Sequence, residues 1–160
     1  MIIKPDYSYN SIFDIDLDEL KNKGIKVILS DLDSTVMPSK SGEFPAKVME
    51  WINNLRKDFD FVIISNNKSE EYIKKAQSQC DFEVIGYANK PSAKAMKKYL
   101  DKKGFSPKSA VMIGDRPLTD ILAGKFLGCK TILVDSITKH TEKPIVRFVR
   151  WLERLFIFPF

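Results

Sequence analysis

Two aspartates with one residue between them follow an apolar segment early in the chain. Asp31 and Asp33 come directly after the apolar run 27–29 and Ser30. Side chains alternate between the two faces of an extended strand, so residues two apart point the same way. Both carboxylates can therefore reach one spot at the end of that strand. Two like charges side by side favour a bound cation, or a division of work between a nucleophile and an acid/base.

Polar side chains also follow the next apolar segment. Ser65 and Asn66 come after the run 61–64, where a hydroxyl and an amide beside a helix N-terminus can hold a phosphate. The alternative is that this segment only caps the helix that follows, through Ser69 or Asn67, which is the commoner role of such a segment. Lys90 stands just before an expected helix, from where its ammonium can reach back to the same edge of the sheet. Here the alternative is a solvated lysine.

A third carboxylate follows the apolar run 110–113. Gly114 lets the backbone come close to whatever lies at the strand end, and Asp115 would face the same crevice as the first two carboxylates. Three carboxylates make a hard-oxygen site suited to Mg²⁺, with waters completing the octahedron. Asp120 lies in the first turn of the following helix, where compensation of the helix dipole is the alternative to a role near the metal.

Strands and helices are expected to alternate along the chain. Apolar, β-branched runs predict strands at residues 27–29, 61–64, 82–85, 110–113 and 131–134, and amphipathic segments predict helices at residues 46–57, 69–78, 92–103 and 117–126. This alternation predicts an α/β fold with a central parallel sheet and helices on both faces. Ligands bind beyond the carboxyl ends of the strands in such folds, which is where the polar residues above fall.

Length and composition indicate one folded domain of 160 residues. Its content of 44% hydrophobic and 29% charged residues is ordinary for a globular protein. The core is expected at about residues 26–134, with an N-terminal extension, 1–25, and a C-terminal tail, 143–160. Two cysteines without metal-ligand spacing predict neither a zinc site nor a disulfide framework. The net charge of +5 favours anionic partners without choosing among phosphorylated substrates, nucleic acid and acidic membranes.

The order of these polar residues resembles the four motifs of the haloacid dehalogenase-like superfamily of phosphohydrolases. Residues 31–35, Asp-Leu-Asp-Ser-Thr, match the first motif, DxDx[TV]. Ser65 matches the second motif, Lys90 the third, and the run 114–120 the fourth, GDxxxxD. A lone DxD would carry little weight, whereas four motifs in order, each after a strand, make coincidence improbable. The resemblance covers residues 26–134 and implies a Rossmann-like, three-layer α/β/α fold.

The resemblance also implies a role for each matched residue. Asp31 would attack phosphorus and form an aspartyl-phosphate, and Asp33 would protonate the leaving oxygen and then activate water. Ser65, with Asn66 beside it, would bind the phosphoryl group, and Lys90 would offset negative charge between nucleophile and phosphate. The implied holders of Mg²⁺ are Asp31, Asp33 through its backbone carbonyl, Asp115 and, in support, Asp120.

The spacing of the motifs leaves no room for a cap domain. Only 29 residues separate Thr35 from Ser65, and 24 separate Ser65 from Lys90. Each gap holds one helix and part of a strand. We therefore expect an open site, which suits a bulky substrate, a macromolecule or a headgroup presented at a surface, unless a partner supplies the lid.

Within the superfamily, the chain resembles the capless subfamily IIIA, and in particular the YqeG-type, phosphatidylglycerophosphate phosphatase-like group. Residues 11–26, which lead into the first motif, and the run 114–121 carry this narrower resemblance. Arg116-Pro117 departs from the residues usual there, which bears on the shape of the loop and not on the carboxylate of Asp115. The resemblance implies a phosphatase for a phosphatidylglycerophosphate-like lipid.

The C-terminal tail has the pattern of a basic amphipathic helix. Arg147, Arg150 and Arg154 fall on one helical face. Apolar residues line the opposite face: Phe148, Val149, Leu152, Leu155 and Phe156. Such a helix either lies on an anionic membrane surface or docks on the sheet edge or on a neighbouring subunit. The aromatic run that follows Leu155 favours contact with a membrane or a partner.

Three functions remain open on the sequence. The first is a phosphomonoesterase for a phosphatidylglycerophosphate-like lipid. It agrees with a cytoplasmic protein, since neither a signal peptide nor a membrane span is apparent, in peripheral contact with the inner face of the cytoplasmic membrane. The second keeps the chemistry on a soluble phosphorylated metabolite, nucleotide or protein. The third is a non-catalytic scaffold or adaptor, against which the complete motif set argues. No nucleic-acid-binding pattern is apparent, and the oligomeric state is open.

Overall fold

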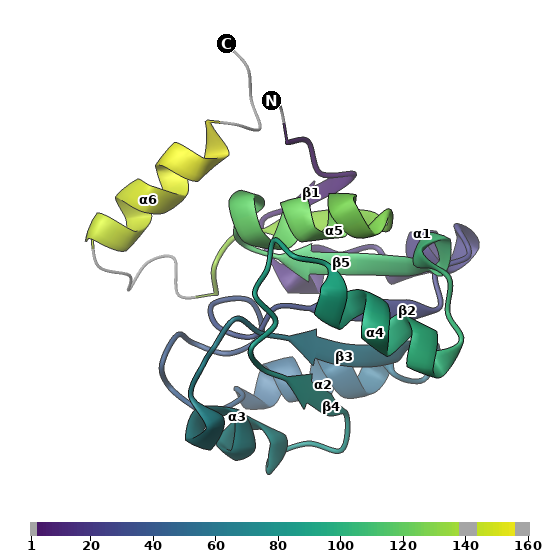
Figure 1. Ribbon diagram of the computed structural model, residues 1–160, viewed down its shortest axis with the longest axis horizontal. Helices are drawn as coiled ribbons and strands as arrows, with labels where there is room; N and C mark the ends of the chain where they lie inside the picture. Colours follow the sequence, from purple (N-terminus) through teal and green to yellow (C-terminus); the bar gives the residue numbers. More distant parts are fainter. Residues whose placement is uncertain (1–2, 138–143, 156–160) are drawn as a thin grey trace.

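The computed structural model describes residues 3–137 and 144–155. In these residues, six parallel strands form one sheet (Figure 1). The strands are β1 (Tyr7–Tyr9), β2 (Val27–Ser30), β3 (Asp60–Ile64), β4 (Glu83–Ile85), β5 (Ala110–Gly114) and β6 (Lys130–Val134). Their order across the sheet is β1-β6-β5-β2-β3-β4. The predicted α/β fold with a central parallel sheet is confirmed, and β1 is a strand that the sequence pattern did not predict.

Helices cover both faces of this sheet (Figure 1). One face carries α1 (Leu17–Asn22), α2 (Ala46–Leu55) and α3 (Glu70–Gln77), and the other carries α4 (Lys94–Lys103) and α5 (Leu122–Leu127). A π-helical turn, Pro117–Ile121, leads into α5, and short 3₁₀ turns lie at Ile12–Asp14 and Pro107–Ser109. The helix predicted over 117–126 is thus two elements, of which the first holds Asp120.

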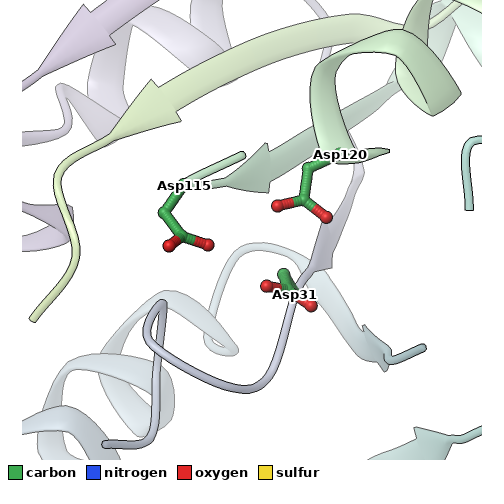
Figure 2. A group of neighbouring side chains, drawn as sticks. All are labelled: Asp31, Asp115 and Asp120. Atoms are coloured by element: carbon green, nitrogen blue, oxygen red, sulfur yellow. The ribbon is translucent and has the colours of Figure 1, made fainter. Parts of the chain in front are cut away.

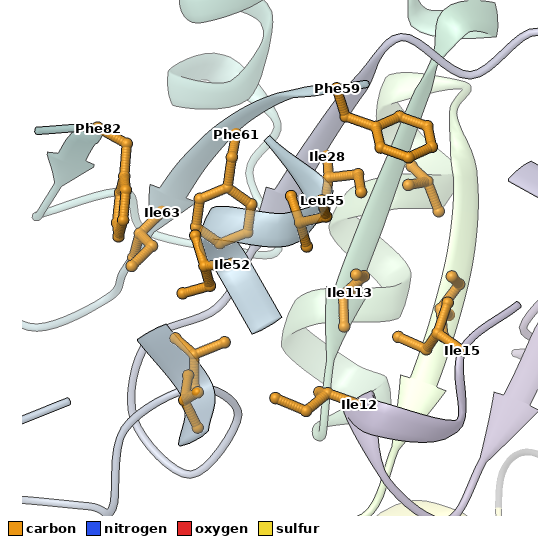
Figure 3. Close-up of a cluster of buried hydrophobic side chains, with 14 of the residues drawn as sticks. Ile12, Ile15, Ile28, Ile52, Leu55, Phe59, Phe61, Ile63, Phe82 and Ile113 are labelled. Carbon is orange, nitrogen blue, oxygen red and sulfur yellow. The ribbon is translucent and has the colours of Figure 1, made fainter. Parts of the chain in front are cut away.

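Apolar side chains fill the space on both sides of the central strands. Ile28 and Ile63 belong to the buried cluster under α2, together with Ile52 (Figure 3). Leu29, which follows Ile28 in β2, faces the other side of the sheet and belongs to the cluster under α4, which includes Met96. Strands that are buried on both faces read as continuous apolar runs, which explains why they were visible in the sequence.

The N-terminal segment is built into the core. β1 pairs in parallel with β6, with Tyr7 opposite Ile132, and so forms one edge of the sheet. Ile12, Ile15 and Leu20 are buried in the same cluster as the central strands. Residues 3–25, the described part of the expected N-terminal extension, therefore supply a strand, a helix and part of the packing under α2.

The C-terminal helix α6 (Pro144–Arg154) stands apart from the helices that cover the sheet (Figure 1). Of the predicted tail, residues 143 and 156–160 and the side chains of Arg147 and Arg150 lie outside the described residues. No helix in the described part of the chain has the length and apolarity needed to cross a bilayer.

The order of the strands brings three loops to one place. β2 lies between β5 and β3, with Ser30 opposite Ile113 on one side and Ile63 on the other. The residues that follow these strands therefore meet at the carboxyl edge of the sheet. The loop 31–45 joins β2 to α2, and α3 joins β3 to β4, so within the described ranges no separate cap covers this edge.

Candidate active site

Four charged side chains meet beyond the carboxyl ends of β2 and β5. The Lys90 ammonium donates to Asp31 Oδ1 at 2.8 Å and to Asp120 Oδ1 at 2.7 Å. One carboxylate oxygen from each of Asp31, Asp115 and Asp120 lies within 4.8 Å of the other two, and Figure 2 shows the three side chains. Lys90, Asp115 and Asp120 are buried, whereas the side chain of Asp31 keeps 14% of its surface exposed. Asp31 is thus the carboxylate of this group that a substrate can reach.

Asp120 owes its position to the glycine that ends β5. A Cβ on Gly114 would lie 2.3 Å from both Cβ and Oδ2 of Asp120, so any other residue there would push the carboxylate away. The backbone N–H of Arg116 donates to Asp120 Oδ2 at 3.1 Å. Both oxygens of Asp120 therefore have donors, and its carboxylate points into the charged group instead of serving only a helix terminus.

Lys90 is held in place through its own backbone by Asn66. The Lys90 N–H donates to Asn66 Oδ1 at 2.7 Å, and Asn66 Nδ2 donates to the Lys90 carbonyl at 3.0 Å. These two bonds tie the loop after β3 to the loop that carries the lysine. Asn66, which was expected at the phosphate, is in this arrangement a residue that positions Lys90.

Ser65 ends β3 and is buried, with 2% of its surface exposed. Its Oγ accepts a hydrogen bond from the Asn67 backbone N–H at 3.0 Å. The cap of the following helix is a different residue, because Ser69 Oγ accepts from the Tyr72 N–H at the start of α3. Ser69 is therefore the cap of α3. Ser65 is not needed as a cap and lies at the carboxyl end of β3, the strand that pairs with β2.

The carboxylate of Asp33 lies apart from the group of three aspartates. β2 ends at Ser30, and Asp33 lies at the start of the turn that follows, where it forms an isolated bridge with Met37. The hydroxyl of Tyr72, on α3, donates to Asp33 Oδ1 at 2.6 Å, and the Lys40 N–H donates to the same oxygen at 3.4 Å. Burial and the bond to Asp33 raise the pKa of Tyr72, which keeps its hydroxyl protonated.

Thr35 links two of the strand ends. Its Oγ1 lies 3.1 Å from Asp115 Oδ1 and 3.5 Å from Asp31 Oδ2. Sequence reasoning placed Thr35 in the first motif without assigning it a contact, and it did not find Tyr72 at all. The signal for Thr35 was its place in the motif, whereas nothing in the local pattern distinguishes Tyr72 from other helix residues that face the sheet.

The electrostatics of the group favour a cation. Burial opposes the charge of Lys90, but Asp120 and Asp31 outweigh it, so the pKa of Lys90 is raised. Burial and the charge of Asp31 raise the pKa of Asp120 to about 6, against the lowering effect of Lys90. Three carboxylates against one ammonium carry a formal charge of minus two in a largely buried place. Oxygen donors with such an excess of negative charge fit Mg²⁺.

A further ion pair connects this site to α6. Nε and Nη2 of Arg116 donate to the two carboxylate oxygens of Glu153, each at 3.1 Å. Arg116 follows Asp115 directly, and 43% of its side-chain surface is exposed, against 6% for Glu153. The loop that carries two of the three aspartates is therefore joined to the C-terminal helix by a bidentate pair, which neither sequence segment revealed by itself.

Solved structures share this architecture. A haloacid dehalogenase-like hydrolase from Streptococcus pneumoniae superposes with a TM-score of 0.57 at 12% identity, covering 79% of this chain and 91% of that one. A haloacid dehalogenase family enzyme from Bacteroides thetaiotaomicron gives 0.54 at 14% identity, covering 76% of this chain and all of that one. At such low identity these similarities establish the fold alone.

Two similar sequences and one family extend this result. "Probable phosphatase YqeG" of Bacillus subtilis (strain 168) is 31% identical over 150 residues, or 94% of this chain and 87% of that one. "Phosphatidylglycerophosphate phosphatase 1, chloroplastic/mitochondrial" of Arabidopsis thaliana is 28% identical over 94% of this chain, which spans 46% of that protein. The family described as "Mitochondrial PGP phosphatase" matches residues 1–138. The chain therefore belongs to this family, and it is a phosphatase of the haloacid dehalogenase type.

Proposed function

We propose that the protein is a Mg²⁺-dependent phosphomonoesterase that works through an aspartyl-phosphate and acts on a phosphatidylglycerophosphate-like lipid. The observation that carries this proposal is the Lys90 ammonium between Asp31 and Asp120, with Asp115 in the same group. A carboxylate can approach a phosphate dianion only where positive charge offsets the repulsion between them. Asp31 is the one carboxylate of this group that keeps part of its surface exposed, and it accepts a hydrogen bond from the positively charged Lys90 ammonium.

In the first step, an oxygen of Asp31 forms a bond to phosphorus while the bond from phosphorus to the ester oxygen breaks. Lys90 holds the orientation of Asp31 and offsets part of the charge that gathers there. A Mg²⁺ ion held by Asp31, Asp115 and Asp120 would supply further positive charge for the phosphoryl oxygens.

Asp33 is suited to the proton transfers. Tyr72 donates to its Oδ1, which leaves Oδ2 as the oxygen that would carry the proton. That proton goes to the departing ester oxygen in the first step. In the second step Asp33 takes a proton from water, whose oxygen bonds to phosphorus as the aspartyl-phosphate bond breaks. Asp31 returns to its carboxylate form and phosphate is released.

Three observations support a lipid substrate. The family and the Arabidopsis relative both bear the name of a phosphatase for phosphatidylglycerophosphate. No separate cap covers the site in the described part of the chain, so a headgroup that remains attached to a membrane could enter it. The net charge of +5 favours an anionic substrate surface.

The test is phosphate release from phosphatidylglycerophosphate in mixed micelles and from a soluble aryl phosphate, with and without Mg²⁺. We expect lipid turnover that requires Mg²⁺ and that falls about 10³-fold or more in Asp31→Asn. Asp18→Asn, at an exposed position in the first turn of α1, removes the same charge away from the site and should leave the rate unchanged. Turnover of the aryl phosphate alone would keep the mechanism and reject the lipid.

A further inference from the structure

The helix α6 turns its apolar side to solvent. The exposed surface is 65% for Ile145, 52% for Phe148, 55% for Trp151, 40% for Leu152 and 38% for Val149. We call these five side chains the α6 apolar face. The rings of Phe148 and Trp151 stack on each other, with centroids 5.9 Å apart, so the face presents a continuous aromatic surface instead of scattered single residues.

Charged groups, in contrast, join α6 to the rest of the molecule. Glu153 is 5% exposed and receives both guanidinium bonds of Arg116. Arg154 Nη2 donates to the Val134 carbonyl at 3.2 Å and lies 3.1 Å from Asp135 Oδ1. A helix that docks on its own sheet to bury apolar surface has the opposite orientation. The α6 apolar face is therefore turned away from the core that the described residues form.

We propose that the α6 apolar face docks on a membrane surface that contains anionic phospholipid. The inference rests on the proposed lipid substrate and names the surface on which that substrate would be met. The sequence from 143 to 150 supplies the charge, with Lys143, Arg147 and Arg150 and no acidic residue among them. Aromatic and aliphatic side chains beside a basic excess bind the boundary between headgroups and acyl chains, and each cation near an anionic leaflet adds to the affinity.

The attachment of α6 gives this docking a consequence at the active site. Glu153 holds Arg116, whose backbone N–H donates to Asp120 and whose neighbour is Asp115. The apolar face and the aspartate group are thus connected through one ion pair and one loop. With α6 on the bilayer, the carboxyl edge of the sheet would be held near the surface, where a phosphorylated lipid headgroup can reach Asp31.

The experiment is sedimentation of the full chain with phosphatidylcholine vesicles that do or do not contain phosphatidylglycerol. We expect binding to the anionic vesicles, and a partition coefficient about tenfold or more lower in the double variant Phe148→Ser/Trp151→Ser. Phe126→Ser is the matched control, because Phe126 is 63% exposed on α5, outside the α6 apolar face. It should bind within about twofold of the wild type. Binding is measured without turnover, so failure of the phosphatase assay leaves this result standing.

A second readout places the helix on the membrane directly. In a Trp51→Phe background, Trp151 is the sole tryptophan, and its emission should shift to shorter wavelength with anionic vesicles. Both α6 side chains are exposed, so the double variant should unfold at the wild-type temperature. The proposal is wrong if wild type and double variant bind equally. It is also wrong if the wild type binds no vesicles and self-associates through α6, with the double variant monomeric.

Discussion

Lysine–aspartate ion pairs occur in two different environments of this molecule, one exposed to solvent and one buried. On the outer face of α4, Lys97 Nζ lies 3.0 Å from Asp101 Oδ2, and the two side chains are 66% and 65% exposed. Beyond the carboxyl ends of β2 and β5, Lys90 Nζ lies 2.8 Å from Asp31 and 2.7 Å from Asp120, and only 1% of its side chain is exposed. The distances are nearly equal, so the geometry of the pair does not distinguish the two sites.

Burial and the number of carboxylates do distinguish them. Water screens the pair on α4, so its charges act on little beyond each other. Lys90 faces two carboxylates in a place of low dielectric, where a charge also acts on any group that enters the site. Burial and, after it, the charge of Asp31 raise the pKa of Asp120 to about 6, although Lys90 lowers it. A buried, charge-unbalanced pair can therefore do chemistry for which an exposed pair is not suited.

The largest effect is expected from removing the buried ammonium. Lys90→Met keeps the length of the side chain, and we expect the rate of phosphate release to fall by about 10²–10³-fold, as when one preorganised charge-stabilising group is lost. Breaking a buried ion pair costs about 3–5 kcal/mol of the free energy of unfolding. Part of that loss is relieved where Asp120 takes up a proton. Initial rates and urea unfolding measure the two effects.

Lys97→Met is the matched control for this prediction. It removes the same charge from an exposed i, i+4 pair, so the free energy of unfolding should change by at most about 0.5 kcal/mol and the rate should not change. An equal loss of rate in both variants would mean that the net charge of the chain, and not the position of Lys90, controls activity.

A second comparison uses two tyrosine–aspartate bonds of similar length. Tyr72 donates to Asp33 at 2.6 Å, and Tyr99 donates to Asp60 at 2.7 Å away from the site. Each Phe variant loses one hydrogen bond to a charged group, which costs about 1.5–3 kcal/mol of the free energy of unfolding. We expect only Tyr72→Phe to lower kcat, by about tenfold, with KM unchanged, because Tyr72 would orient the carboxylate of Asp33, the proposed acid/base. An equal loss of kcat in Tyr99→Phe would contradict this positioning role.

The strands and the motif order were predictable because they depend on local pattern. A strand that is buried on both faces, such as β3, must be apolar throughout, and the residue after it must lie at the sheet edge. That was enough to group Asp31, Ser65, Lys90 and Asp115. For Lys90 the sequence allowed two environments, and only the fold shows that its ammonium is buried between carboxylates.

The remainder depends on contacts between distant residues, which local pattern does not contain. β1 has three residues and alternates polar with aromatic, and its place is fixed by β6 and by the bond from the Thr131 N–H to Asp6, 125 residues away. Arg116 and Glu153 stand 37 residues apart. The helix predicted over 117–126 is split into a π-helical turn, which holds Asp120, and α5, and the helical period of the segment does not show this split.

The smallest effect is expected at the Arg116–Glu153 ion pair, which is the tether between the active-site loop and α6. Glu153→Gln keeps the shape of the side chain and removes the charge that receives both bonds of Arg116. We expect the amides of α6 to exchange hydrogen about fivefold to tenfold faster, because one charge-assisted pair is weakened in an element with few other core contacts. Global unfolding should be unchanged, because the apolar core does not include this helix.

The control is Glu83→Gln, which weakens the exposed pair with Lys102 at 2.8 Å and should leave exchange in α6 as it is. If Glu153→Gln also leaves α6 unchanged, then Arg154 and its partners at the end of β6 hold the helix without help. If Glu153→Gln speeds exchange in α6 and lowers turnover of the lipid but not of a soluble phosphate, then the tether matters for how the site meets the membrane. Arg116–Glu153 would then be a third kind of pair, with one exposed and one buried partner. Its buried carboxylate would couple α6 to the loop that carries Asp115 and Asp120.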